Sequence, residues 1–197
     1  MIDELNDPVQ LCFTDHVDTV YRSLDSLQGP MAEAAWSIRD TLLGGGKLLT
    51  GGYGTGCALS QLFASLLLSR LSMERPPLPV VPIGGEAAVL GAIADGYGFQ
   101  ESLARQIQAV ASPGDAVLLV AGGSGIGVSQ AVRSAHSREA KVVLLCGLGG
   151  QEQPQRIDGE DIELRIPSEE SARVLECQLL VLNCLVELIE RAIFGDY

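Results

Sequence analysis

Two glycine-rich loops have the residue pattern with the clearest chemical meaning in this chain. The first loop, Gly51–Gly56, lies between an apolar run and an apolar helical segment within Lys47–Leu71, and the second loop spans Ala121–Gly127. Backbone N–H groups at a helix N-terminus lack intrahelical partners, and the helix dipole favours negative charge there. A glycine loop that leads into a helix is therefore typical of a phosphate-binding site. The alternative is that the glycines only permit a tight turn.

Neither loop matches a standard nucleotide-binding motif or a hydrolase motif. Cys57 and Val128 stand where GxGxxG requires its third glycine, and Lys47 is not followed by the Ser or Thr of a P-loop. The second loop approaches a nucleophile elbow, but Ile126 replaces the last glycine. His136 would lie about 18 Å further along the same helix. The sequence therefore argues against dinucleotide binding, NTP binding and serine hydrolysis.

The remaining polar chemistry is sparse. His16 and His136 are the only histidines, and both fall within predicted helices. No pair of histidines or carboxylates has metal-ligand spacing, so we expect no metal and no other cofactor. The five cysteines are scattered through apolar segments, which is typical of reduced thiols in the cytosol.

The charge balance limits the possible partners. Twenty-five acidic residues against 13 basic ones give a formal net charge of −12. Because binding to a phosphate backbone needs clustered Lys and Arg, we expect no direct contact with nucleic acid. The chain has no basic-plus-apolar N-terminal signal, and charged residues interrupt its most apolar helical segment, Val174–Ile189. The expected location is the cytoplasm, with no membrane contact.

The elements around the loops alternate between strand and helix. Apolar runs such as AVLLVA are typical of strands that are covered on both faces, and alternating βαβ units imply a parallel sheet. We predict strands near 47–51, 79–83, 115–121, 141–146 and 161–166, and helices near 56–71, 86–95, 99–111, 126–138 and 169–194. The expected fold is an α/β three-layer αβα sandwich with a five-stranded parallel sheet, whose ligand crevice lies at the carboxyl ends of the strands.

Two amphipathic helices are predicted before the first strand, over residues 8–27 and about 30–43, and Gly44–Gly46 ends the second. Two such helices cannot both bury their apolar faces on a small sheet, so we expect them to take part in subunit packing. The predicted organisation is a single domain over residues 1–197. It consists of an N-terminal helical oligomerisation segment, 1–45, and an αβα core, 46–197.

Several specific stretches carry a family resemblance that covers nearly the whole chain. They are the first glycine loop with Gln61-x-Phe63, Glu74–Pro79 (ERPPLP), Tyr97–Phe99, Pro113–Asp115, Arg165–Ser168 (RIPS) and Ser171–Arg173. Together they resemble the sugar isomerase (SIS) domain family, in its phosphoheptose isomerase branch. Within that branch the chain is most similar to the DnaA initiator-associating proteins. The resemblance implies a homotetramer that binds the initiator DnaA and regulates the initiation of chromosome replication.

The resemblance also implies the loss of catalysis. The isomerases of this family carry a His and a Glu on the helix after the first loop, and a Gln and a His on the last helix. These groups bind zinc and transfer the proton. The matching positions here are Leu62, Leu66, Leu175 and Asn183. Leucine cannot act as a base, so we expect no catalytic residue and no isomerase activity.

We expect the sugar-phosphate pocket to persist only as a remnant. Tyr53 and Gly56 stand where the family has an Asn and a Ser, which removes polar donors, and Tyr53 is expected to project into the former sugar space. A sugar phosphate is a possible partner of this remnant. Its predicted residues are Tyr53, Gly54, Thr55, Gly56, Glu86, Asp95, Gly122, Gly123 and Ser124.

The resemblance places the DnaA contact at Ile193 and Phe194, near the end of the last helix. An exposed aromatic residue near a chain terminus is a suitable interface anchor, although the same pair could instead contact the core of its own subunit. Two alternative functions stay open. One is a phosphoheptose isomerase with a rearranged site that uses Glu86 or Asp95 as its base, and the other is a sugar-phosphate sensor.

Overall fold

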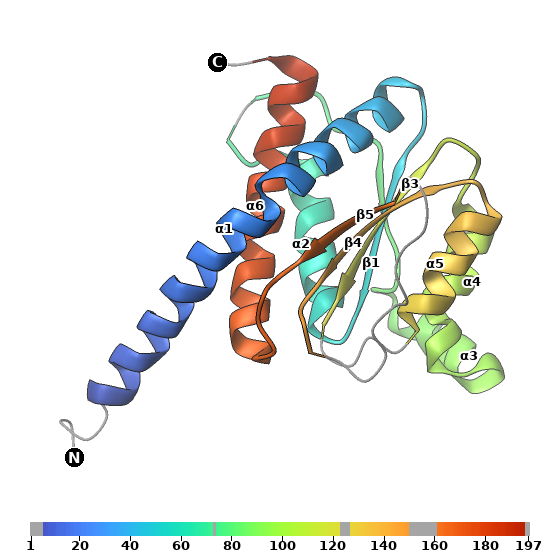
Figure 1. Ribbon diagram of the computed structural model, residues 1–197. Coiled ribbons are helices and arrows are strands. Elements are labelled where there is room, and N and C mark those ends of the chain that lie inside the picture. The colour runs from blue at the N-terminus through green and yellow to red at the C-terminus, as the bar shows by residue number, and fades with distance from the viewer. Residues whose placement is uncertain (1–5, 73, 123–126, 150–160, 196–197) are drawn as a thin grey trace.

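Five parallel strands form one sheet at the centre of the structure (Figure 1). This computed structural model describes residues 6–72, 74–122, 127–149 and 161–195. The order across the sheet is β2-β1-β3-β4-β5. The strands are β1 (Leu48–Tyr53), β2 (Val80–Pro82), β3 (Ala116–Ala121), β4 (Lys141–Cys146) and β5 (Ile162–Arg165). Since Tyr53 pairs with Ala121, the two glycine loops leave the sheet side by side at its carboxyl edge.

Helices cover both faces of this sheet (Figure 1). One face carries α1 (Asn6–Leu43), α2 (Thr55–Leu68) and α6 (Ser171–Phe194), and the other carries α3 (Ala87–Tyr97), η2 (Phe99–Glu101), α4 (Ser102–Val110) and α5 (Val128–Ser137). Each face has its own cluster of buried apolar side chains. The three-layer αβα sandwich predicted from the sequence is therefore confirmed. Within the described ranges, none of the helices combines the length and the apolar character needed to cross a membrane.

The N-terminal region differs from the prediction of two helices. It forms one continuous helix, α1, which passes through Gly29 and Pro30 without a break. A proline inside a helix removes one backbone hydrogen bond and costs about 3 kcal/mol. Burial offsets this cost, because Leu27 before the proline and Ile38 after it belong to the same apolar cluster against α2 and α6. Tertiary packing has overridden the local turn signal.

The first half of α1 stands away from the body of the subunit (Figure 1). Phe13 and Tyr21 on this half are 71% and 68% exposed, and Val9, Val17 and Leu24 are also exposed. His16 and Cys12 contact α6: the His16 ring forms a 2.7 Å hydrogen bond with a carboxylate there, and the Cys12 carbonyl accepts a bond from a guanidinium group. A stripe of apolar side chains on α1 is thus left uncovered by its own chain.

Asp115 ties the amino ends of β1 and β3 together. Its carboxylate accepts hydrogen bonds from the backbone N–H of Lys47 at 2.9 Å, from the Lys47 ammonium at 2.5 Å, and from the N–H of Ser112 at 2.8 Å. Burial by itself would raise the pKa of Asp115, but these bonds outweigh it and hold the pKa below its usual value. The ionised carboxylate therefore stabilises this end of the sheet.

We predict that Asp115→Asn lowers the free energy of unfolding by about 1–3 kcal/mol at pH 7, because it removes a charged acceptor with three partners. A carboxyl group with a depressed folded-state pKa contributes stability above its unfolded pKa of about 4, and loses it as the pH falls through the folded value. The gap between wild type and variant should therefore shrink as the pH falls from about 5 through the depressed folded-state pKa.

Urea denaturation at a series of pH values measures this gap. Asp25→Asn, at an exposed position on α1, is the matched control and should leave stability nearly unchanged at each pH. A gap for Asp115→Asn that stays constant on acidification would contradict the assignment.

Candidate functional site

The first glycine loop connects the end of β1 to the start of α2. Tyr53 ends the strand, Gly54 adopts the left-handed region with φ +59°, and Thr55 begins the helix. Gly54 and Thr55 are exposed, whereas Gly56 is buried. Only Gly54 separates the strand from the helix, so the turn is tight. Its positive φ is a conformation that favours glycine.

The two glycine loops lie in direct backbone contact. A Cβ atom placed on Gly56 would lie 2.1 Å from the carbonyl oxygen of Val120, and one placed on Gly122 would lie 2.5 Å from the backbone nitrogen of Gly56. A Cβ on Gly52 would lie 2.4 Å from the carbonyl carbon of Gly56. Only glycine fits at these three positions. The serine that the family resemblance places at position 56 therefore has no room in this backbone arrangement.

Tyr53 packs between Gly127 and η2. Its hydroxyl donates a 2.9 Å hydrogen bond to the carbonyl of Gln100 and accepts one from the N–H of Leu103 at 3.3 Å. The ring meets the Phe99 ring edge-on at 5.6 Å between centroids, and a Cβ on Gly127 would lie 2.4 Å from the Tyr53 hydroxyl oxygen. The side chain is thus part of the packing beside the loop.

The chemistry of this tyrosine is correspondingly restricted. Burial raises its pKa to about 12; the Leu103 N–H lowers it, and the charge of Glu101 raises it further. The phenol is therefore neutral at physiological pH and cannot serve as a base. The neighbouring Cys57 thiol donates to the carbonyl of Gly84 at 3.2 Å, and burial raises its pKa too, so it is not a thiolate nucleophile.

The four positions that the family resemblance assigns to the isomerases' catalytic groups lie on two neighbouring helices, α2 and α6, which pack against each other on one face of the sheet. Leu62 is 41% exposed, while Leu66 and Leu175 are partly buried against the apolar cluster of that face. Asn183 is half-buried on α6. The structure thus brings these positions to one side of the molecule, where three of the four present hydrocarbon.

The other predicted pocket residues are placed differently. Glu86 precedes α3 and Asp95 lies on it, so both belong to the opposite face of the sheet, and both are exposed. Gly123 and Ser124 fall outside the described residues. Among the residues that are described, no group of three or more His, Cys, Asp or Glu side chains is arranged to hold a metal ion.

The predicted partner contact lies at the other end of α6. Phe194 is the last residue of the helix and is 40% exposed, whereas Ile193 is partly buried and packs against the apolar cluster. The C-terminal ends of α2 and α6 are directed away from the glycine loops (Figure 1). The pocket remnant and the Ile193–Phe194 pair therefore lie at opposite ends of the subunit.

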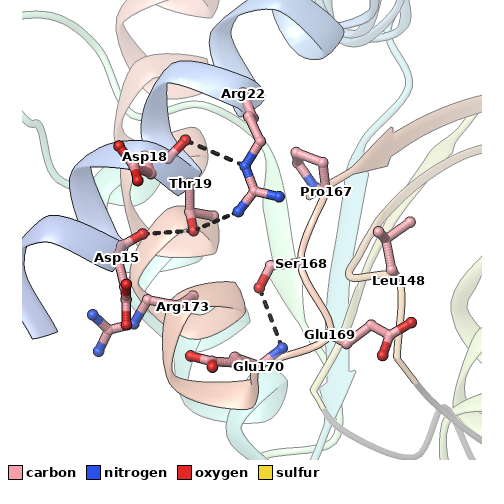
Figure 2. Close-up of a pocket in the computed structure, with 10 residues that line it drawn as sticks. All are labelled: Asp15, Asp18, Thr19, Arg22, Leu148, Pro167, Ser168, Glu169, Glu170 and Arg173. Atoms are coloured by element: carbon pink, nitrogen blue, oxygen red, sulfur yellow. Dashed lines mark hydrogen bonds between the residues drawn. The ribbon is translucent and has the colours of Figure 1, made fainter. Parts of the chain in front are cut away.

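A cavity of about 380 Å³ opens at the carboxyl edge beyond β4 and β5. Figure 2 shows α1 side chains on one wall and the β5–α6 connection on the other. Arg22 is bonded to Thr19, so its charge is partly engaged. The sequence did not single out this cavity, because its walls come from three distant segments, and none of the predicted pocket residues lines it. The lining residues are Asp15, Asp18, Thr19, Arg22, Leu148, Pro167, Ser168, Glu169, Glu170 and Arg173.

Comparison with known proteins identifies the family. The chain is 35% identical over 189 residues to the DnaA initiator-associating protein DiaA of Pectobacterium atrosepticum, which covers 95% of this chain and 96% of the relative. It is 34% identical over 191 residues to DiaA of Shigella flexneri, with 96% and 97% covered. The chain belongs to the DiaA family. No protein-family model matches the sequence.

Solved structures agree with this assignment to the DiaA family and its isomerase relatives. A phosphoheptose isomerase from Francisella tularensis superposes with a TM-score of 0.88 at 32% identity, covering 94% of this chain and 97% of that one. A phosphoheptose isomerase from Neisseria gonorrhoeae gives a TM-score of 0.85 at 27% identity, with 94% and 98% covered. The resemblance to the SIS family and its phosphoheptose isomerase branch is therefore confirmed.

We predict that Gly56→Ala lowers the free energy of unfolding by about 1–3 kcal/mol or more, because its methyl group would overlap the backbone of β3. Gly91→Ala on α3 is the matched control: a Cβ there meets nothing within 4 Å. This control should raise stability by up to about 1 kcal/mol through helix propensity. Thermal and urea unfolding measure both changes, and a stable Gly56→Ala protein would show that the loops can separate.

Proposed function

We propose that this protein is a non-catalytic homotetramer of the cytoplasm that binds the initiator DnaA and regulates the initiation of chromosome replication. The observation that carries this proposal is the similarity to DnaA initiator-associating proteins over 95% of the chain. Its acidic composition supports an action through a protein partner, because a net charge of −12 disfavours direct binding to DNA.

The side chains on α2 and α6 support the absence of catalysis. Leucine at positions 62, 66 and 175 can neither accept a proton nor bind zinc. Isomerisation between adjacent carbons needs a positioned base, and the exposed Glu86 and Asp95 lie on the other face of the sheet. Turnover of sedoheptulose 7-phosphate by the purified protein, abolished by changing either acid, would favour the isomerase alternative instead.

The uncovered apolar surface supports assembly into an oligomer. The exposed stripe on the first half of α1 includes Phe13, Tyr21 and Leu24. Helix α3 has no buried residue within its own subunit although it is mostly apolar. Large exposed apolar surfaces on a folded subunit typically mark protein interfaces. A tetramer would also present four copies of the Ile193–Phe194 pair, so that weak contacts with DnaA add up through avidity.

We predict that Phe194→Ala weakens DnaA binding by about 2 kcal/mol or more, as expected for a buried aromatic interface anchor. The variant should keep its oligomeric state and thermal stability. Val110→Ala is the control, because Val110 is 37% exposed at the end of α4, on the other face of the sheet from α6. Surface plasmon resonance with immobilised DnaA measures both affinities, and unchanged binding by Phe194→Ala would remove the proposed contact.

A second prediction concerns assembly. The double substitution Phe13→Asp and Leu24→Asp places two charges on the apolar stripe of α1 and should dissociate the tetramer, because burying an unpaired charge is costly. Asp7→Asn on the same helix should have no such effect. Sedimentation velocity measures the mass of each species. A double variant that sediments as a tetramer would exclude this stripe from the interface.

A further inference from the structure

Arg75 forms a buried ion pair that joins the C-terminal ends of two helices. Its Nε donates to a carboxylate oxygen of Glu190 on α6 at 2.9 Å, and the two side chains are 1% and 0% exposed. The rest of the guanidinium points to α2, where Nη2 donates to the carbonyl of Leu66 at 2.9 Å and Nη1 to that of Leu67 at 2.7 Å. These carbonyls belong to the last turn of α2, whose oxygens lack intrahelical partners.

Glu190 lies one turn before the proposed contact residues. Ile193 and Phe194 are three and four positions further along α6, so they lie on the same side of the helix as Glu190 and about 5–6 Å along its axis. The segment that carries Arg75 passes beside this end of α6 (Figure 1). The ion pair is therefore directly next to the turn that presents Phe194.

We infer that Arg75 is a positioning residue for DnaA binding: its ion pair with Glu190 fixes the last turn of α6, and thereby the orientation of Phe194, relative to α2. This inference rests on the function proposed above. Helix ends fray unless tertiary contacts hold them, and an aromatic anchor binds more tightly when its position is set in advance. A guanidinium suits this role because its planar fork bonds a carboxylate and two carbonyls in one fixed geometry.

The plain alternative is that Arg75 only closes the end of α2 and stabilises the fold. The two possibilities differ in what a substitution changes. A purely stabilising residue affects the free energy of unfolding and leaves the dynamics of the α6 end unchanged in the folded tetramer. A positioning residue changes the local opening of residues 191–195 and the affinity for DnaA while the tetramer persists.

The test is the double variant Arg75→Met and Glu190→Met in the full-length protein. Replacing both members of a buried pair by apolar residues of similar length removes the two charges together, which destabilises the fold much less than leaving one of them unpaired. We expect amide hydrogen exchange in residues 191–195 to rise about tenfold while the rest of α6 is unchanged. We also expect affinity for DnaA to fall about tenfold, with an unchanged sedimentation coefficient.

The matched control is Arg70→Met with Glu74→Met. These residues form an ion pair on the same connecting segment, but their side chains are 57% and 82% exposed. An exposed pair contributes little, so exchange and affinity should both stay at wild-type values. Wild-type exchange and wild-type affinity in the Arg75 and Glu190 variant would overturn the positioning role.

Two further outcomes are decisive. If the double Met variant does not assemble, Arg75→Lys replaces it, because lysine can reach Glu190 but cannot hold both α2 carbonyls. Weaker DnaA binding by an intact Arg75→Lys tetramer supports the inference. Wild-type DnaA binding by this variant overturns it. The exchange measurement requires no DnaA. Faster exchange in the double variant together with no DnaA binding by the wild-type protein would therefore support the local role of Arg75 and reject the proposed function.

Discussion

The arrangement of this subunit depends on the backbone contact between its two glycine loops. Gly52 and Gly56 lie against Val120 and Gly122 at distances that admit no Cβ atom, so the start of α2 rests directly on the end of β3. On the same face of the sheet, the Gln178 amide on α6 donates to the carbonyl of Ala121 at 2.9 Å. The start of α2 and the first half of α6 are thereby both fixed to the carboxyl end of β3. The C-terminal turns of these two helices are joined by Arg75 at the opposite end.

This constraint gives the glycine loops a packing role that does not depend on a bound ligand. In a parallel α/β sheet the strand ends and helix starts form the ligand crevice, and the same close contacts also hold the layers together. Leu66 and Leu175 add apolar contact on α2 and α6, and the proposed absence of catalysis rests on leucine at these positions and at position 62. The glycine contacts can therefore hold α2 against β3 whether or not the loops bind a ligand.

Helix α6 connects the two ends of the molecule. Gln178 in its first half bonds to the end of β3, the helix packs on α1 and α2, and its last turn carries Ile193 and Phe194. The proposed partner surface thus lies at the end of the subunit opposite the glycine loops. The buried pair of Arg75 and Glu190 joins the C-terminal end of α2 to the last turns of α6, next to Phe194.

The sequence by itself determined the αβα sandwich, the five strands and the family, because apolar runs of strand length and the glycine punctuation are local signals. It also placed Phe194 at the end of the last helix. Only the tertiary structure decided that α1 is continuous through Pro30, since residues on both sides bury in one core. It alone showed the cavity beneath α1 and the pairing of Arg75 with Glu190, 115 positions apart. Such contacts join segments that are distant in the chain, so no local sequence pattern indicates which two charged residues form a buried pair.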